Sequence, residues 1–329
     1  MRAAIWEQPG ELRIGEREDP TPGHGELVVE VGACGMCGTD LHIADGAFAP
    51  TPYPIVPGHE FAGEIVAIGP SVEGWSEGDR VAVDPSLFCG HCEMCRIGRG
   101  NLCESWSAIG DRVDGAFAEY VKVPAENAYA LPDELSFREG ALVEPVSCAV
   151  RGMHRLQVQP GESALIVGAG TMGLLLEQLI LRAGASRVAL VDANEGKLPL
   201  AEKLGADAVA TSTEGLGRFD VAVDATGAAP AIESAFDALK RGGRLMIFGV
   251  AHGGARVSLS PFRIYNDEIT VLGSMAVLHS FGPALELVAA GAIDTAAMLT
   301  HDFPLDGFAD ALENVRAGRG VKSQVLPGA

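Results

Sequence analysis

The chain has 329 residues, of which 47% are apolar and 6% aromatic, and its formal net charge is −20. This length favours two domains, and the negative charge argues against partners such as nucleic acid or an anionic membrane surface. The N-terminus lacks the apolar core of a signal peptide and no apolar run is long enough to span a membrane, so we expect a cytoplasmic protein whose seven cysteines stay reduced and serve metal binding or catalysis.

The first 140 residues predict a β-rich domain. Apolar and polar residues alternate at 25–32, 60–69, 78–83 and 116–123, which favours four strands. A proline-rich stretch at 50–57 favours an extended loop between the first two of these strands. Short strands separated by turn signals at this spacing are typical of a barrel-like domain.

A four-cysteine cluster lies within this domain. Its members are Cys89, Cys92, Cys95 and Cys103, separated by two, two and seven residues. Four thiolates at short spacing suit a closed, tetrahedral zinc site. A bacterial iron–sulfur run would place the fourth cysteine after three residues and before a proline, whereas Glu104 follows here. A chance group of surface thiols is the remaining alternative. We predict a structural zinc that holds a lobe at 85–104 and has no open position for a substrate.

From Gly161 onward, strands and helices alternate. Strands are expected at 164–168, 187–192, 208–210, 219–224, 244–249 and 269–273, with a helix at 231–240 among the connections. This alternation predicts an α/β fold, a doubly wound parallel sheet covered on both faces. Helices expected at 282–290 and 307–316 do not extend that sheet. We therefore expect domains at 1–147 and 148–277, with 278–329 returning to the first.

A glycine-rich turn follows the first strand of this second domain. Its residues are Gly168, Ala169, Gly170, Thr171, Met172 and Gly173, and an apolar helix continues from it. The three glycines would allow the turn, the approach of a phosphate and the close packing of helix on strand. Because a helix N-terminus binds anions, this G-x-G-x-x-G pattern predicts a pyrophosphate site of a dinucleotide.

Residues after the later strands support a dinucleotide. Asp192 ends the second strand 19 positions after Gly173, close to the offset of an acid that binds the adenosine ribose. An acid there repels a 2′-phosphate and so favours NAD over NADP. Lys197 is either a ribose contact or a solvated helix lysine. Thr226, Val250 and Ser274 also follow strands, where ligands of open sheets bind.

A second metal set is spread along the chain. Cys37 lies in a segment that also holds Thr39, Asp40 and His42, and Gly58-His59-Glu60 follows 22 residues later. Glu144 interrupts an apolar run, where a buried carboxylate needs a partner. Cys37, His59 and Glu144 would leave a zinc ion one open position for catalysis. Each also has a structural explanation: a packed core cysteine, a hydrogen-bonded histidine, and a helix start with Pro145 in its first turn.

Together these motifs resemble the zinc-containing medium-chain alcohol dehydrogenases over nearly the whole chain. The matching pieces are Cys37-Gly38-Thr39-Asp40-x-His42, Gly58-His59-Glu60-x2-Gly63, the four-cysteine lobe, Glu144-Pro145 and the glycine turn. The resemblance implies a GroES-like catalytic domain, split in sequence around a Rossmann domain, and a cleft for zinc and nicotinamide. It also implies a homodimer or homotetramer.

The resemblance further assigns roles to single residues. Thr39 and His42 correspond to the family's proton relay, with Thr39 at the substrate hydroxyl and His42 at the solvent end. Asp40 would accept a hydrogen bond from His59. The same resemblance makes Val250 and Ser274 nicotinamide contacts. Candidates for the substrate pocket are Phe48, Phe88 and Trp106, although a core role is equally compatible with each.

Glu144 occupies the position where the resemblance places a second cysteine of the alcohol dehydrogenase zinc site. A carboxylate there resembles the polyol (sorbitol-type) branch, in which Glu60 also binds zinc directly or by exchange with water. We therefore expect NAD-dependent oxidation of a secondary alcohol, a small-molecule polyol or sugar alcohol, to a ketone by hydride transfer from a zinc-bound alkoxide. Threonine 3-dehydrogenase, a short-chain alcohol or diol dehydrogenase, and a non-catalytic zinc and nucleotide protein are the alternatives.

Overall fold

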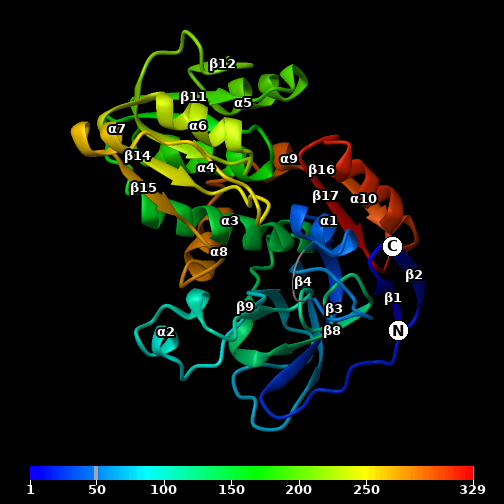
Figure 1. The fold of residues 1–329 in the computed structure, drawn as a ribbon. Helices are drawn as coiled ribbons and strands as arrows, with labels where there is room; N and C mark the ends of the chain where they lie inside the picture. Colours follow the sequence, from blue (N-terminus) through cyan, green and yellow to red (C-terminus); the bar gives the residue numbers. More distant parts are fainter. Residues whose placement is uncertain (48–50, 329) are drawn as a thin grey trace. The chain divides into compact units, whose positions relative to one another are not determined.

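The computed structural model describes residues 1–47 and 51–328 (Figure 1). The chain packs into two compact units. Unit 1 comprises Met1–Ser147, Val277–Gly291 and Thr295–Ala329, and unit 2 comprises Cys148–Ala276 and Ala292–Asp294. Relative to the expected division at 147 and 277, residue 277 falls in unit 1 and residues 292–294 fall in unit 2. Within the described residues, no helix combines the length and hydropathy that crossing a bilayer requires.

A seven-stranded sheet forms the centre of unit 1. Its order is β16-β17-β3-β4-β5-β9, and β8 also pairs with β3. The strands are β3 (Glu26–Gly35), β4 (Glu60–Ile68), β5 (Arg80–Val83), β8 (Tyr120–Pro124), β9 (Ala128–Ala130), β16 (Leu299–Pro304) and β17 (Lys322–Leu326). Alternate residues of β3, such as Leu27, Val29 and Val31, enter one core with Phe61 and Ile65 of β4, as the two-residue period of a strand requires.

Unit 1 differs from the expected strands in three places. Residues 116–118 were expected to open a strand at 116–123, but they bond instead to the N-terminal hairpin, where Ala4 N–H donates to the Phe117 carbonyl at 2.8 Å. The hairpin itself, β1 (Arg2–Gln8) and β2 (Glu11–Glu16), was not predicted. β16 and β17 were not predicted either, because Lys322, Ser323 and Gln324 are buried polar residues and give β17 no period-two pattern.

The helices of unit 1 lie between and after these strands. They are α1 (Gly38–Ala44), α2 (Glu93–Arg96), α8 (Phe281–Ala289), α9 (Thr295–Met298) and α10 (Phe308–Arg316), and a short hairpin of β6 (Ser86–Leu87) and β7 (Ser107–Ala108) flanks α2. The long helix α3 (Phe137–Leu156) begins in unit 1 and ends in unit 2. Glu144 and Pro145 lie in the middle of α3, so the alternative of a helix start at Glu144 is wrong.

Unit 2 contains six parallel strands in the order β12-β11-β10-β13-β14-β15. The strands are β10 (Ser163–Val167), β11 (Arg187–Val191), β12 (Ala208–Ala210), β13 (Phe219–Asp224), β14 (Leu239–Ile247) and β15 (Thr270–Gly273). The helices that connect them are α4 (Thr171–Arg182), α5 (Leu198–Leu204), α6 (Ala229–Asp237) and α7 (Pro261–Asn266). All six expected strands are present. Numbered in chain order the sheet runs 3-2-1-4-5-6, the Rossmann order, which reverses between β10 and β13 and makes that edge the place for a nucleotide.

Candidate functional site

The central strand β3 brings the first metal set together. Gly35, at its end, pairs with Glu60 of β4 on one side and with Gln324 of β17 on the other. Cys37 follows this end of β3 and His59 precedes β4, so antiparallel pairing makes them neighbours. The candidate ligand atoms of Cys37, His59 and Glu60 all lie within 4.8 Å of one another.

Local structure holds the thiol of Cys37. Cys37 is the N-cap of α1: its Sγ accepts the Thr39 N–H at 3.3 Å, and its own N–H donates to Asp40 Oδ2 at 2.8 Å. Backbone N–H groups and the positive end of a helix stabilise a thiolate, which is the form that binds metals.

His59 and Asp40 face each other without touching. His59 Nδ1 lies 4.0 Å from Asp40 Oδ1, beyond hydrogen-bond distance, and neither buried atom has a hydrogen-bond partner among the described residues. Burial raises the pKa of Asp40 to about 6, although the nearby His59 opposes the rise. Burial alone would lower the pKa of His59, but the combined effects of Cys37, Asp40 and Glu144 leave that pKa raised. The site is thus net anionic, which suits a divalent cation.

Glu60 forms an ion pair with Lys322, a residue that sequence reasoning missed. Both side chains are 3% exposed, and Lys322 Nζ also donates to the Met36 carbonyl at 3.0 Å. Gly35 leaves room for the pair, because a Cβ there would meet Glu60 Oε2 and Lys322 Cε. No motif marks Lys322 in the sequence; only the pairing of β17 with β3 reveals it.

Glu144 lies farther from this cluster. It is 8% exposed, and its charge raises the pKa of both His59 and Lys322. It is not among the residues whose ligand atoms meet within 4.8 Å, which are Cys37, His59 and Glu60. The structure therefore brings three of the four predicted catalytic-zinc ligands together and puts the fourth within electrostatic range.

The helix α1 carries both predicted relay residues. Thr39 is in its first turn and His42 in its last, and both are partly buried. Residues three apart lie on the same face of a helix, so one turn separates the hydroxyl near Cys37 from the imidazole. Of the predicted pocket residues, Phe88 is 46% exposed and Trp106 is partly buried, whereas Phe48 lies outside the described residues.

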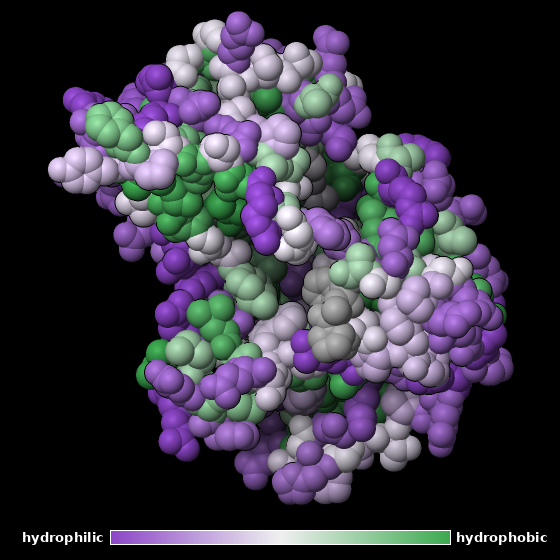
Figure 2. All heavy atoms as spheres, in the orientation of Figure 1, coloured by the Kyte–Doolittle hydropathy of each residue, from purple (hydrophilic) through white to green (hydrophobic). Residues whose placement is uncertain are grey.

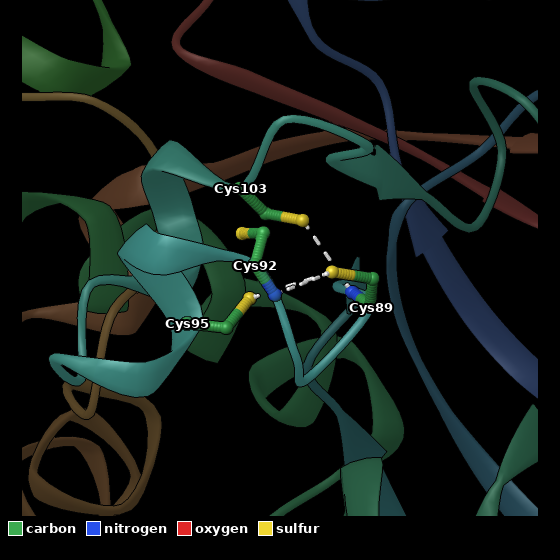
Figure 3. Close-up of side chains that lie close together, drawn as sticks. All are labelled: Cys89, Cys92, Cys95 and Cys103. Carbon is green, nitrogen blue, oxygen red and sulfur yellow. Dashed lines mark hydrogen bonds between the residues drawn. The ribbon is translucent and has the colours of Figure 1, made fainter.

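The four-cysteine lobe forms a second site. The ligand atoms of Cys89, Cys92, Cys95 and Cys103 lie within 4.8 Å of one another, and Figure 3 shows their side chains around a common space. The Sγ atoms of Cys89 and Cys95 are 4.0 Å apart, near the roughly 3.8 Å expected between thiolates 2.3 Å from a tetrahedral zinc. The N–H groups of Cys92 and Ser105 donate to the sulfurs of Cys89 and Cys103, each at 3.3 Å, so this donor set fits zinc.

The glycine turn of unit 2 fits a pyrophosphate. Gly168 has φ +113°, and a Cβ there would meet Thr226. A Cβ at Gly173 would meet the Gly168 carbonyl, whereas one at Gly170, the N-cap of α4, would meet nothing within 4 Å. Open space therefore lies beside Gly170, at a helix N-terminus whose first turn holds Thr171 and Met172.

Asp192 is tied to this turn. Its carboxylate accepts the Ala169 N–H at 2.7 Å and the Asn194 N–H at 2.8 Å. The other predicted nucleotide contacts lie at the same edge of the sheet: Thr226 follows β13 and donates to Asp224 at 2.6 Å, and Ser274 follows β15. Val250, beyond β14, is 69% exposed. Lys197 lies at the start of α5.

Together, a Rossmann sheet with its glycine turn and a β-rich unit with two metal donor sets define a zinc- and nucleotide-binding dehydrogenase. The family described as an alcohol dehydrogenase GroES-like domain matches residues 23–133, and that described as a zinc-binding dehydrogenase matches residues 171–290. The chain belongs to the zinc-containing medium-chain alcohol dehydrogenases. It is therefore an alcohol dehydrogenase that acts on a small molecule with zinc and a nicotinamide dinucleotide as cofactors.

Several relatives cover nearly the whole chain. D-arabinitol dehydrogenase 1 of Uromyces fabae is 37% identical and covers 99% of this chain and 97% of its own length. Sorbitol dehydrogenase of Bacillus subtilis is 34% identical, with 95% and 93% covered. L-threonine 3-dehydrogenase of Shewanella woodyi is 33% identical, with 92% of each chain covered.

Solved structures share the fold. A zinc-binding dehydrogenase from Sinorhizobium meliloti, bound to NADP, has a TM-score of 0.95 at 36% identity, with 99% of each chain covered. A short chain alcohol dehydrogenase from E. coli, complexed with NADH, has a TM-score of 0.93 at 30% identity, also with 99% of each chain covered. These neighbours hold different nicotinamide cofactors and leave the choice between NAD and NADP open for this chain.

Proposed function

We propose that this enzyme oxidises a secondary alcohol of a polyol or sugar alcohol to the ketone with NAD. The observation that carries the proposal is the donor set of Cys37, His59 and Glu60, whose candidate ligand atoms all lie within 4.8 Å of one another. The likeness to D-arabinitol and sorbitol dehydrogenases supports the substrate class.

In this proposal, unit 1 is the catalytic domain and unit 2 the dinucleotide domain. Cys37 and His59 hold the catalytic zinc together with Glu144 or Glu60, and the lobe at 85–104 holds a structural zinc. When bound, zinc lowers the pKa of the substrate hydroxyl as a Lewis acid, and NAD accepts the hydride. The carboxylate of Asp40 faces Nδ1 of His59 at 4.0 Å and favours this orientation of the ring electrostatically, which leaves Nε2 for the metal.

The proton of the substrate hydroxyl leaves along α1. Thr39 accepts this proton at its hydroxyl oxygen while donating its own, and His42 carries it toward solvent. The single turn between these residues supports the relay, because a short chain of donors and acceptors can join them.

We propose NAD rather than NADP because of Asp192. Two backbone N–H groups hold its carboxylate beside the glycine turn, where a negative charge repels a 2′-phosphate. Gly168, Gly170, Thr171, Met172 and Gly173 would bind the pyrophosphate, and Lys197, Thr226, Val250 and Ser274 would contact other parts of the dinucleotide.

Threonine oxidation is the second candidate, supported by the likeness to L-threonine 3-dehydrogenase. Against it, Glu144-Pro145-Val146 differs from the Asp-Pro-Phe-Gly-Asn stretch by which a resemblance to that enzyme would be recognised. Short-chain alcohols and diols form the third class of substrate to be tested.

We also propose a homo-oligomer, at least a dimer, formed through the edge strand β15 of unit 2. β15 is the last strand of its sheet, and hydrophobic side chains gather on the surface over α7 and β15 (Figure 2). Phe262 is 73% exposed, Tyr265 82% and Val271 37%. An unpaired edge beside exposed aromatic residues favours pairing with a second copy.

The free cysteines support a reducing, cytoplasmic compartment.

Substrate screening tests the proposed function. The purified enzyme is supplied with NAD or NADP and a panel of polyols, threonine, diols and simple alcohols, with and without a chelator. We expect the highest kcat/KM with a polyol and NAD, and loss of activity with chelator. Preference for threonine, a lower KM for NADP than for NAD, or no turnover across the panel would each contradict the corresponding part of the proposal.

A further inference from the structure

A cavity of about 390 Å³ lies within unit 1, apart from both metal donor sets. Residues from three segments line it: 84–88 before the cysteine lobe, 124–129 around the start of β9, and 277–279 before α8. None of the lining residues is a candidate metal ligand. Phe88, a candidate for the substrate pocket, therefore belongs to a different cavity from the one that the metal donors would form.

Three polar side chains, one from each segment, converge on this cavity. Asp84 Oδ1 accepts the Ser86 N–H at 2.9 Å. Burial raises the pKa of Asp84, and hydrogen bonds from Ser86 and the charge of His279 oppose the rise. Burial, and then the charge of Asp84, raise the pKa of Tyr129. A carboxylate, an imidazole and a phenol thus lie within electrostatic range of one another around one space, the pattern of a ligand site.

Aromatic and aliphatic side chains form the rest of the wall. Phe88 is 46% exposed, so much of its ring is open to solvent. The ring of Tyr129 packs on Phe281 with centroids 4.8 Å apart, which holds that ring in place. Leu87 and Leu278 also line the cavity. An apolar body can lie against these side chains, and an aromatic face attracts a positive charge.

The charges around the cavity select the sign of a ligand. Asp84 and Glu126 both line it, whereas no lysine or arginine does so among the residues that the structure describes. A phosphate or carboxylate would be repelled there. The half-buried carboxylate of Asp84 has lost part of its hydration, and a cation compensates that loss. The lining therefore favours a ligand that is positively charged and has an apolar body.

We propose that this cavity is a second binding site of the enzyme, which takes a small organic ammonium ion. The positive charge faces Asp84, and the apolar body lies against Phe88 and Tyr129. This site goes beyond the proposed oxidation of a polyol, because it shares no residue with the metal donors or with the predicted dinucleotide contacts.

Calorimetric titration of the zinc-loaded enzyme tests the site, with benzyltrimethylammonium chloride as the probe. The quaternary nitrogen has no lone pair, so this ion does not bind zinc, and benzenesulfonate is its oppositely charged analogue. The variants are Asp84→Asn, which keeps an oxygen for the Ser86 N–H, and Phe88→Ala. Glu134→Gln is the matched control, because Glu134 is an exposed carboxylate of unit 1 that does not line the cavity.

We expect one benzyltrimethylammonium ion to bind per chain. Asp84→Asn should weaken binding at least about tenfold, because it removes the opposite charge. Phe88→Ala should weaken it about two- to fivefold, the range of a partly exposed cation–π contact. Glu134→Gln should bind the probe as the wild type does, and benzenesulfonate should not bind in the cavity.

Absence of probe binding to the wild type would overturn the proposal. Equal affinity in Asp84→Asn and the wild type would do so too, because binding would then reflect a general attraction of cations to an acidic chain. Binding of benzenesulfonate that Asp84→Asn strengthens would show that the cavity takes anions instead. The titration measures no turnover, so a failed polyol screen leaves this site intact, and a failed titration leaves the proposed polyol oxidation intact.

Discussion

At the scale of single residues, Cys37 and Asp40 show how local sequence can prepare a metal ligand. The two residues form a capping box at the start of α1, in which Cys37 Sγ accepts one N–H group and Asp40 accepts another. Residues two and three positions apart in sequence make these contacts, so the thiol is oriented by its own helix. His59 depends on longer-range contacts: its approach to Cys37 requires the pairing of β3 with β4.

Thr39 can be tested by removing its hydroxyl while keeping its shape. Thr39→Val should lower kcat by about 100-fold or more, in the range of positioned proton transfer, while zinc content stays the same. Rates of alcohol oxidation and metal analysis measure the two effects, and Thr39→Ser serves as the control that keeps the hydroxyl. Undiminished turnover in Thr39→Val would exclude the relay.

At the scale of elements, the lobe between β6 and β7 depends on its cysteines. Its helix α2 has four residues and no buried side chain, so it has almost no core of its own. A metal ion bound by the four thiolates would replace that missing core, as in other small metal-stabilised structures. The spacing of the cysteines was sufficient to predict this lobe, because all four ligands come from one short segment.

Replacing one of these cysteines tests the lobe. Cys95→Ser should lose one zinc per chain and make the lobe sensitive to trypsin at Arg96 or Arg99, while the catalytic metal is retained. Metal analysis and limited proteolysis measure both effects. Cys148 belongs to neither group of candidate ligands. The control variant Cys148→Ser should therefore keep the full metal content. Equal zinc content in Cys95→Ser and the wild type would show that no structural zinc binds there.

Helix α4 carries a buried carboxyl group that gives unit 2 a pH dependence. Glu177 is fully buried, and burial raises its pKa to about 8, although the Ala206 N–H offsets the rise in part. An unfolded glutamate titrates at about 4.3. Between these two values the folded chain keeps a proton that the unfolded chain has lost, so this group makes stability fall as pH rises from about 4.3 to about 8.

Glu177→Gln should remove this dependence. At pH 8 we expect the variant to be more stable than the wild type by up to about 4 to 5 kcal/mol, and the gain should vanish near pH 4. Urea unfolding at several pH values measures it, with Glu202→Gln on α5, where the glutamate is exposed, as the control. A gain that does not grow with pH would mean that Glu177 is not protonated in the folded chain.

At the scale of the whole molecule, the proposed association of copies depends on the edge strand β15. The sequence gives no sign that β15 lies at a sheet edge, since Val271 and Leu272 read as part of an ordinary buried strand. Only the sheet order shows that β15 has a partner on one side alone.

A charged residue on this edge tests the proposed association. Val271→Lys should convert a dimer, or the dimers within a tetramer, to smaller species, because lysine on an edge strand opposes strand pairing. Sedimentation velocity measures the mass, and Val113→Lys, at a 45% exposed valine of unit 1, is the control. A mass unchanged by Val271→Lys would place the contact elsewhere.

Patterns in the sequence were enough to predict the Rossmann sheet, the glycine turn and the cysteine lobe. The central strands β10, β11 and β13 are largely buried and therefore read as apolar runs, and the alternation of strands with helices marks the edge strands. The four lobe cysteines lie within one short segment. The sequence also placed Cys37, His59 and Glu144 as metal ligands through their motifs, although their roles stay predictions.

Tertiary structure alone decided which groups meet at the catalytic site. The ion pair of Glu60 and Lys322 joins residues from β4 and β17, and the strand that carries Lys322 was not predicted at all. The pattern of apolar residues within one strand or helix predicts which of its faces is buried. It does not predict which distant strands pair with each other, because pairing and register are settled by the whole sheet. A buried lysine inside a short polar strand has no local signal, and its place beside Glu60 follows only from the pairing of β17 with β3 and of β3 with β4.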